Sequence, residues 1–463
     1  GDGVNIAARL ERLAEPGGIC ISREVYNQVR NKLALDVTDM GEQRIKNIGE
    51  PVQVFRVNLG TGPAGLAAAG FARDGQEKPS LAVLPFVTSE SDPDLAYVSE
   101  GISEELIGDL ARLNGLFVVA RSSSFMFRDG TATSGHAAPQ LGVRYLLGGT
   151  VRPGDEVAID ATLVDSMTGK SLWSGSYSCG FPEIFKIFGM IVGDVAEKLV
   201  GPPDEEWRAR ASRARAATPE AYEALLKGRE LYGRMTPDDD RAAHEQFSRA
   251  IAFDPTCAEA LGWLAMIHQH AYRQRRQEDE AEAGAKCARA ALALDDNLAL
   301  AHHALGYLQL FRKRFLQAQF PLSKAVGLDG NDSVALSRMG LLNCSLGKAS
   351  EALELFHRAA RLNPCHAGRY LGLRGMAFFV ARRYDEALEA FNRMPSPYYW
   401  ERAYHAATFA MLGRIDNARH KLTEVLHIMP SFAVDRLAHV EPFQSPDDRH
   451  HFLEALRRAG LPT

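Results

Sequence analysis

The chain has 463 residues, which is too long for one ordinary core and predicts two or three domains. Hydrophobic residues make up 46% of the chain and charged residues 24%, and the net charge is −5. So small a net negative charge does not indicate a nucleic-acid or membrane-surface partner. No stretch reaches the roughly 18–20 apolar residues of a membrane span, and there is no signal peptide, so we expect a cytoplasmic protein. The cysteines form no CxxC pair and are expected to be reduced and mostly buried: Cys20, Cys179, Cys257, Cys287, Cys344 and Cys365.

Residues 1–57 combine helical and strand patterns. We expect a short strand at 17–22, a short amphipathic helix at 23–30 and an alternating strand at 52–57. The next segment, 58–78, is rich in Gly and Ala without a periodic apolar face, which is typical of a linker.

Residues 79–200 predict a compact α/β domain. The expected strands and helices, in chain order, are a buried strand at 80–86, an amphipathic helix at 99–113, a second buried strand at 116–120, strands at 144–151, 157–165 and 171–177 joined by hairpin turns, and a helix at 181–200. A further helix is expected before residue 144. The series SLAVLPF…SEGISEELIGDLARL…LFVVARSSSFMF…LGVRYLLGGTVR…SLWSGSY resembles the TolB-like α/β domain, a family that implies no catalytic residues.

After a connector at 201–218, residues 219–431 become helical and repetitive. Gly306 and Gly340 lie 34 positions apart, and Asp295, Asp329 and Asn363 are spaced by 34 and again by 34. This period is that of tetratricopeptide repeats, and we expect about six of them, with an insertion near 273–280 and a shortened repeat at 393–397. Residues 432–463 are expected to form a capping segment that ends in a helix.

The repeats predict antiparallel helix pairs stacked into an all-α right-handed superhelix with a concave groove. We expect that groove to bind an unidentified peptide or protein and to be lined by residues of the first helix of each repeat: Tyr222, Leu264, Tyr307 and Phe378.

The first eleven residues, GDGVNIAARLE, place Asn5 and Arg9 four positions apart, on one face of a predicted helix. An ordinary polar surface helix is one interpretation of this pattern. The stretch also resembles the end of the class III adenylate/guanylate cyclase catalytic domain, and the resemblance continues through LAEPGGICISREVYNQV and MGEQRIKNIGEPVQVFRV to residue 57. By this resemblance, residues 1–57 are the C-terminal third of that domain, and the chain is the back part of a longer cyclase.

The resemblance implies that Arg9 stabilises the transition state on the α-phosphate of ATP and that Asn5 holds the ribose. Lys46 falls where the family has a lysine that contacts the terminal phosphates, although an exposed hairpin lysine is an equal alternative. The parent enzyme would be a homodimer that uses Mg²⁺ or Mn²⁺. The aspartates that bind these ions would lie upstream of Gly1, so this chain alone is expected to be inactive and to bind no metal. ATP is preferred to GTP only because ATP is the usual substrate in such bacterial architectures.

Two other sequence patterns give little support for a phosphate or metal site. TGKS (168–171) ends like a phosphate-binding loop, but Val164 stands where the first glycine is required, and the stretch predicts a hairpin turn. The adjacent pairs His302–His303 and His450–His451 point in different directions on a helix and predict surface residues rather than metal ligands.

Two functions therefore remain open. The chain is either the C-terminal portion of a bacterial adenylate cyclase, with the TolB-like and repeat regions acting in regulation or partner binding, or a non-enzymatic repeat scaffold that binds a peptide or protein.

Overall fold

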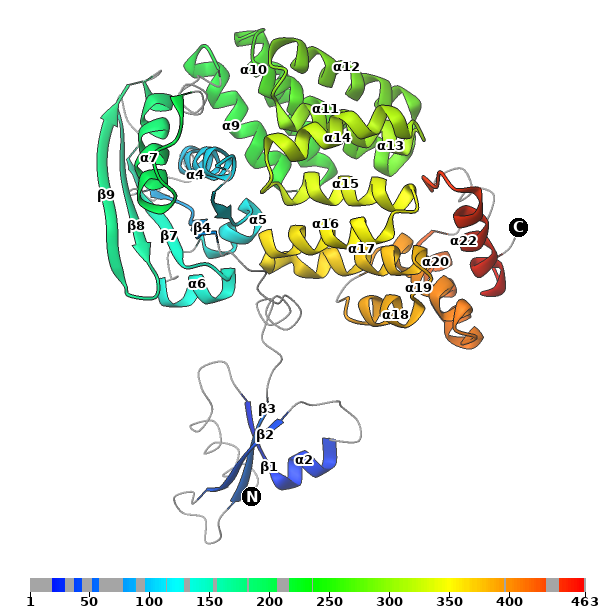
Figure 1. The fold of residues 1–463 in the computed structure, drawn as a ribbon. Helices are drawn as coiled ribbons and strands as arrows, with labels where there is room; N and C mark the ends of the chain where they lie inside the picture. Colours follow the sequence, from blue (N-terminus) through cyan, green and yellow to red (C-terminus); the bar gives the residue numbers. More distant parts are fainter. Residues whose placement is uncertain are drawn as a thin grey trace. The chain divides into compact units, whose positions relative to one another are not determined.

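In a computed structural model, the structure of the chain is described for residues 19–29, 37–43, 52–57, 78–88, 96–113, 115–128, 134–152, 156–180, 183–205, 216–234, 236–394, 397–429 and 441–461. The chain divides into two compact units, Gly1–Ala72 and Arg73–Thr463 (Figure 1). Among the described residues, no helix is both long and apolar enough to cross a membrane.

In the described residues of the first unit, a three-stranded antiparallel sheet in the order β1-β3-β2 is accompanied by one helix. Strand β1 (Ile19–Ser22) runs into helix α2 (Arg23–Val29), and β2 (Val37–Gln43) and β3 (Val52–Val57) complete the sheet. The helix packs on the central strand through Tyr26, whose ring stacks on Phe55 with centroids 4.6 Å apart. The strand predicted at 52–57 and the short helix predicted at 23–30 are therefore present.

The second unit begins with a six-stranded mixed sheet in the order β6-β4-β7-β8-β9, with β5 beside β7. Its strands are β4 (Ser80–Val83), β5 (Val87–Thr88), β6 (Phe117–Val118), β7 (Tyr145–Arg152), β8 (Val157–Asp165) and β9 (Lys170–Cys179). Strand β4 is parallel to β6 and β7, whereas β7, β8 and β9 form an antiparallel meander. These positions agree with the strands expected from the sequence.

Helices cover both faces of this sheet. Helices α4 (Ala96–Ala111) and α7 (Ile184–Leu199) pack on the face to which β8 presents Ile159, Ala161 and Leu163. Helix α6 (Ser134–Leu141) packs on the opposite face, near Ala82 and Leu146. A short helix, α5 (Arg121–Ser124), continues into a 3₁₀ turn, η3 (Phe125–Phe127), in a segment whose sequence pattern predicts no helix.

Six helix pairs follow in the described part of the chain. They are α9 (Pro219–Gly233) with α10 (Pro237–Phe253), α11 (Ala258–Arg275) with α12 (Glu278–Leu294), α13 (Ala299–Phe311) with α14 (Phe315–Leu328), α15 (Ser333–Ser345) with α16 (Ala349–Leu362), α17 (Ala367–Val380) with α18 (Tyr384–Asn392), and α19 (Tyr399–Met411) with α20 (Ile415–Ile428). A 3₁₀ turn, η4 (Pro364–His366), precedes α17. The C-terminal part is thus a helical repeat array that resembles tetratricopeptide-repeat proteins.

Small residues stand where the two helices of a pair cross. A Cβ added to Gly340 would lie 2.5 Å from the ring of Phe356, and one added to Gly306 would lie 2.5 Å from Leu322. The insertion near 273–280 lengthens both helices of the second pair: α11 has 18 residues and α12 has 17, against 13 and 14 in the third pair. The shortening at 393–397 leaves α18 with nine residues.

In five of the six described pairs, the turn between the two helices contains a residue with positive φ. Gly347 (φ 76°) and Gly413 (φ 74°) supply it in two pairs, whereas Arg276, Lys313 and Arg382 adopt φ values of 56°, 57° and 63° in others. A side chain in this left-handed region is strained, which is why glycine favours such turns. The array keeps its turn geometry even where the sequence lacks the glycine.

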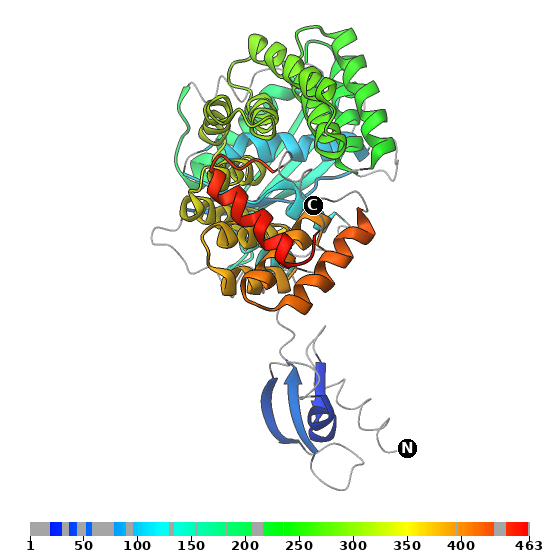
Figure 2. The same ribbon diagram turned by 90° about the vertical axis from the view of Figure 1, so that its right-hand side faces the viewer.

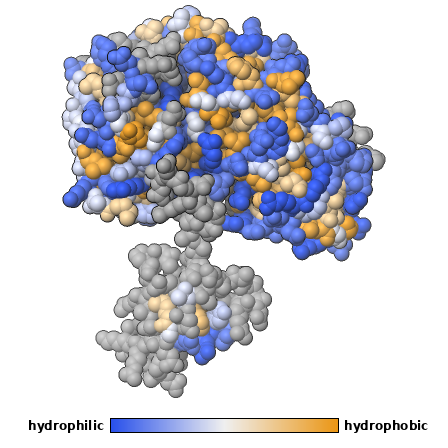
Figure 3. All heavy atoms as spheres, in the orientation of Figure 1, coloured by the Kyte–Doolittle hydropathy of each residue, from blue (hydrophilic) through white to orange (hydrophobic). Residues whose placement is uncertain are grey.

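Figure 2 shows the repeat helices following an arc, with the final helix, α22 (Pro446–Arg458), in front of them. The first helices of successive pairs contact one another more closely than the second helices do, so the first helices lie on the inner side of the arc. On the face drawn in Figure 3, hydrophobic and hydrophilic residues of the second unit are interspersed.

Candidate functional site

The three residues that the cyclase resemblance identifies, Asn5, Arg9 and Lys46, lie outside the described residues. The structure therefore neither brings them together nor separates them, and their roles stay predictions. Among the described residues, no three His, Cys, Asp or Glu side chains lie together as metal ligands would.

The TGKS stretch is a hairpin turn, as predicted. Gly169 has φ 68°, its N–H donates to the carbonyl of Asp165 at 2.8 Å, and Lys170 begins strand β9. A phosphate-binding loop would instead lead into a helix whose N–H groups face the ligand. This turn therefore supports no nucleotide site.

The prediction that the paired histidines lie on the surface is wrong for His302 and His303, which are 6% and 2% exposed. Both belong to α13, an inner helix, and burial together with the positive charge of Arg338 lowers the pKa of His303 to about 3. His450 is exposed, whereas His451 is half-buried and lies 2.9 Å from the hydroxyl of Tyr384.

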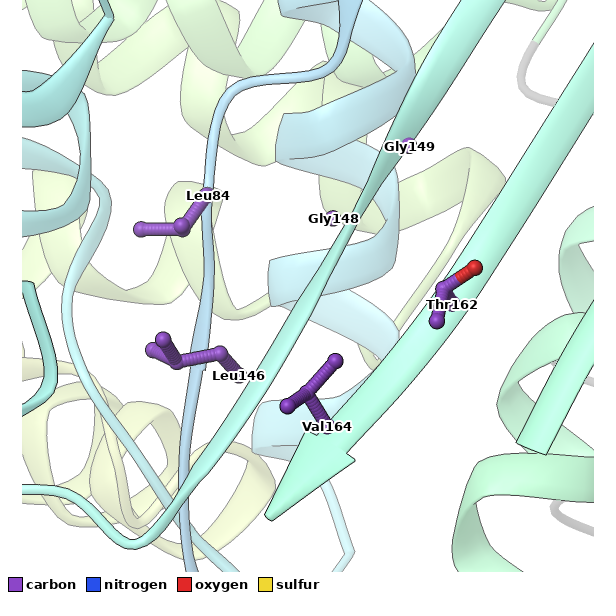
Figure 4. A pocket seen from close by; sticks show the side chains of 6 residues that line it. All are labelled: Leu84, Leu146, Gly148, Gly149, Thr162 and Val164. Atoms are coloured by element: carbon purple, nitrogen blue, oxygen red, sulfur yellow. The ribbon is translucent and has the colours of Figure 1, made fainter. Parts of the chain in front are cut away.

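A small hollow of about 230 Å³ opens on the sheet beside β7 and β8 (Figure 4). Its lining is Leu84, Leu146, Gly148, Gly149, Thr162 and Val164. The lining includes one hydroxyl and no ionisable side chain. It offers no acid, base or nucleophile and is not a candidate active site.

A buried ion-pair network joins the α/β region to the first helix pair. Arg229 of α9 donates to Glu105 of α4 at 2.5 Å and to Glu259 of α11 at 3.3 Å, and it also pairs with Glu104. Glu104 pairs in turn with Arg121 of α5. Arg229 is 9% exposed and Glu105 is 5% exposed, so these charges are held away from water in pairs. The network is an interface between two regions rather than a reaction site.

Two asparagines from turns between repeats extend this interface. Asn331 donates to the carbonyls of Ala111 and Leu116 at 2.6 and 3.2 Å. The side-chain oxygen of Asn363 accepts hydrogen bonds from Ser122 and Ser123 at 2.8 and 2.7 Å. The repeat array and the α/β region are therefore joined at three places and form one body.

The residues predicted to line an open groove are buried instead. Tyr307 is 1% exposed, Tyr222 6%, and Leu264 and Phe378 8% each. Tyr222 packs edge-on against Phe185 of α7, with centroids 5.0 Å apart, so it belongs to the contact with the α/β region. The prediction selected large apolar residues of the inner helices, and these are the residues that pack between neighbouring helices.

Arginines, rather than those four apolar or aromatic residues, mark the inner surface. Arg273 of α11 and Arg369 of α17 are exposed, and the half-buried Arg338 of α15 lies over the ring of Tyr307, with its guanidinium carbon 4.3 Å from the ring centroid. Burial, and then the like charges of Arg273 and Arg369, lower the pKa of Arg338. We call Arg273, Arg338 and Arg369 the arginine cluster.

The segment before α22 crosses the same inner surface. Glu441 accepts a hydrogen bond from the hydroxyl of Tyr404 at 3.3 Å, and Arg276 and Lys313 attract its carboxylate. The N–H of Gln444 donates to the carbonyl of Ser345 at 2.9 Å. The chain's own C-terminal segment thus places a carboxylate against cationic residues of the array.

The predicted terminal helix is present, but it does not simply extend the stack. Helix α22 packs on α19, and its Asp448 pairs with Arg382 at 2.8 Å, in the turn between α17 and α18. Its Asp448 also approaches Gly347, in the turn between α15 and α16. The helix therefore lies across the turns of earlier pairs, a placement that the capping prediction did not include.

No protein-family model matches the chain. Over 275 residues the chain is 35% identical to a protein named "Putative adenylate cyclase 3" from Rhizobium meliloti (strain 1021), a match that covers 58% of this chain and 46% of that protein. The chain thus spans less than half the length of this curated relative.

Solved structures with similar helices include PilF of Pseudomonas aeruginosa, at 20% identity and a TM-score of 0.36, covering 46% of this chain and 95% of that one. Another is a thermophilic tetratricopeptide-repeat protein of Thermus thermophilus, at 18% identity and a TM-score of 0.34, covering 41% of this chain and 98% of that one. At these scores, neither carries an argument about function.

Proposed function

We propose that the chain is the C-terminal part of a bacterial adenylate cyclase, which converts ATP to cyclic AMP and pyrophosphate. The observation that carries this proposal is the 35% identity over 275 residues to a protein with that name. The resemblance of residues 1–57 to the end of a class III catalytic domain also supports it, because that resemblance rests on particular residues such as Asn5 and Arg9.

In this proposal the chain contributes one half of a site that two subunits share. The ribose 3′-hydroxyl attacks the α-phosphorus, and negative charge grows on the α-phosphate oxygens and on the leaving pyrophosphate. The planar guanidinium of Arg9 matches these oxygens and stabilises the transition state more than the ground state. Asn5 holds the ribose, and Lys46 contacts the terminal phosphates.

The intact homodimer would use Mg²⁺ or Mn²⁺, which neutralises the triphosphate and activates the attacking hydroxyl. The resemblance to class III cyclases implies that the aspartates that hold such an ion lie upstream of Gly1, outside this sequence. We further propose that residues 79–200 are a TolB-like domain and that the whole protein works in the cytoplasm.

The α/β region and the repeat array are joined into one body, and we propose that this body regulates the parent enzyme. Because Arg229, Asn331 and Asn363 fasten the array to the α/β region, a partner bound to the repeats would act on both regions together. We propose that this body responds to a protein or peptide and transmits the response to the catalytic unit.

Cyclic nucleotide production by the complete reading frame tests the proposal. The purified full-length protein is incubated with ATP or GTP and Mg²⁺ or Mn²⁺, and the products are measured by mass spectrometry. We expect cyclic AMP from the full-length protein and none from the 463-residue chain. A full-length protein that makes no cyclic nucleotide from either substrate would contradict the cyclase proposal.

A non-enzymatic scaffold is the second candidate. The arginine cluster on the inner surface of the repeats favours it, since such a surface can bind a partner without any catalysis. Full-length protein that binds a partner through the repeats but lacks cyclase activity would favour this candidate.

A further inference from the structure

We infer that the inner surface of the repeat array binds an acidic peptide segment of a protein partner, with Arg273, Arg338 and Arg369 as the residues that recognise its carboxylates. This inference deepens the partner-binding part of the proposed function and rests on it. It does not depend on the cyclase activity.

The first observation is the lack of counter-ions. Several exposed arginines in the described part of the chain have an ion-pair partner, among them Arg234 and Arg383. No ion pair joins a member of the arginine cluster to any described residue. The charges of Arg273 and Arg369 oppose the charge of Arg338, so an anion bound among the three would stabilise the charged form of Arg338.

The second observation is that Arg338 has an unused donor. Its Nε is shielded from solvent and has no hydrogen-bond partner among the described residues. The rest of the side chain is held over Tyr307, which fixes the direction of the guanidinium. A preorganised arginine fork of this kind binds carboxylate oxygens in pairs.

Two acidic side chains near the cluster, Asp332 and Glu401, do not serve as its counter-ions. Burial raises the pKa of Asp332, which lies near Arg338 and uses its carboxylate to cap the start of α15. Glu401 of α19 feels the charges of Arg273 and Arg369, but burial raises its pKa to about 7. Its carboxylate accepts the N–H of Tyr398 at 2.7 Å and packs against Gly372. It is therefore used in capping α19 and is only partly ionised at neutral pH.

The third observation is that a carboxylate already occupies the adjoining part of the surface. Glu441 of this chain lies near Arg276, one turn of α11 beyond Arg273, and near Lys313. One glutamate of this chain's own C-terminal segment thus lies on the inner surface, where burial raises its pKa and the two cations oppose that rise. A partner segment on the arginine cluster would continue the same kind of contact.

The spacing favours a peptide over a single small anion. Arg338 and Arg369 come from α15 and α17, which are neighbouring inner helices, and Arg273 comes from α11. Packed helices lie about 8–10 Å apart, and an extended chain advances about 3.3 Å per residue. Acidic residues roughly three positions apart would thus meet Arg338 and Arg369. Because α13 lies between α11 and α15, an acidic residue about twice as far along the peptide would meet Arg273.

Peptide binding to the 463-residue chain tests the inference. The probe is a fluorescein-labelled peptide of about twelve residues with Glu at every third position, a spacing that follows from the helix separation. The control peptide has Gln in place of each Glu. Fluorescence anisotropy should show binding of the acidic peptide, weakened by added salt, and binding of the Gln peptide at least about tenfold weaker.

The variants locate the site. Arg338→Gln, and separately the exposed pair Arg273→Gln with Arg369→Gln, should each weaken binding of the acidic peptide by about tenfold or more. The matched control is Arg374→Gln, because Arg374 also belongs to α17 and also lacks an ion pair among the described residues, but it faces Arg393 and Glu389 of α18. It should leave binding unchanged. Circular dichroism checks that each variant folds. If Arg338→Gln does not fold, the double variant at the exposed Arg273 and Arg369 still tests the site.

Several results would overturn the inference. Equal binding of the Glu and Gln peptides, no binding of either, or full binding by the cluster variants would each do so. Displacement of the peptide by inorganic phosphate at equal ionic strength would show a site for a single oxyanion rather than for an acidic segment. Failure here leaves cyclic AMP production untouched, so it is distinguishable from failure of the cyclase proposal.

Discussion

Arg229 of the first repeat helix donates to Glu105 of the α/β region at 2.5 Å, and both side chains are buried. Removing the arginine would take the ion pair with Arg229 from the buried Glu105, and Glu104 would keep only its pair with Arg121. Loss of one partner of a buried ion pair typically costs about 3–5 kcal/mol. We expect Arg229→Met to lower the free energy of unfolding by that order, measured by urea denaturation.

The control for this change is Arg234→Met. Arg234, at the end of α9, pairs with Glu230, but the two side chains are 55% and 33% exposed, so the loss should stay below about 1 kcal/mol. If the two variants unfold at the same urea concentration, the Arg229 network does not hold the two regions together.

Asn331 and Asn297 provide a matched pair, because they occupy equivalent turns one repeat apart. Asn331 donates to the carbonyls of Ala111 and Leu116, whereas the exposed Asn297 has its side chain bonded to Asp296. Asn331→Ala should therefore destabilise the protein by about 1–3 kcal/mol and Asn297→Ala by less than about 0.5 kcal/mol. Thermal unfolding of both variants measures this difference. Similar losses would mean that the Asn331 contacts contribute little.

Gly340 and Gly327 test the helix crossing inside the repeats. A methyl group at Gly340 would lie 2.5 Å from the Phe356 ring, whereas a methyl at Gly327 meets nothing within 4 Å. Gly340→Ala should cost about 1–3 kcal/mol through overpacking. Gly327→Ala, in α14, should be neutral or stabilise by up to about 1 kcal/mol. Calorimetry of the two variants should give shifts of opposite sign or clearly different size, and equal destabilisation would contradict the crossing geometry.

His405 predicts a pH dependence. It is 7% exposed, its ring stacks on Phe409, and burial lowers its pKa from 6.5 to about 4. Since the folded pKa lies below the unfolded one, the folded state binds fewer protons. The stability is complete above about pH 6.5 and is lost as the pH falls toward the folded pKa.

The variant His405→Phe keeps the stacking and removes the titration. Between pH 6.5 and about 4, the natural protein should lose about 1–3 kcal/mol relative to this variant. Urea denaturation across that range measures the difference. Parallel stability curves for the two proteins would show that His405 does not contribute.

Much of the fold follows from short-range patterns. The 34-residue spacing of Gly306 and Gly340 predicts the helix pairs because small residues must stand where two helices cross, and the structure places both there. The strands at 144–151 and 157–165 follow from alternating apolar residues and a hairpin turn, and β7 and β8 agree with them.

The missed features depend on contacts between distant segments. The hydroxyls of Ser122 and Ser123 bond Asn363, more than 200 positions away, and no local pattern in RSSSFMF signals that partner. Likewise, His303 looks like a surface residue in a helix with two adjacent histidines, but the curvature of the array buries it beside Arg338. The candidate catalytic residues could be named only through a resemblance, and they remain predictions.

The proposed action of Arg9 across a shared cyclase site can be examined by mixing subunits. In the full-length homodimer, Arg9→Ala should lower kcat by roughly 10²-fold or more without changing dimerisation. A second variant lacks the metal-binding aspartates. Each variant should be inactive alone, but a heterodimer keeps one complete site, so cyclic AMP production should return on mixing. Heterodimers that form and still make no cyclic AMP would contradict the shared site and leave Arg9 as a surface arginine.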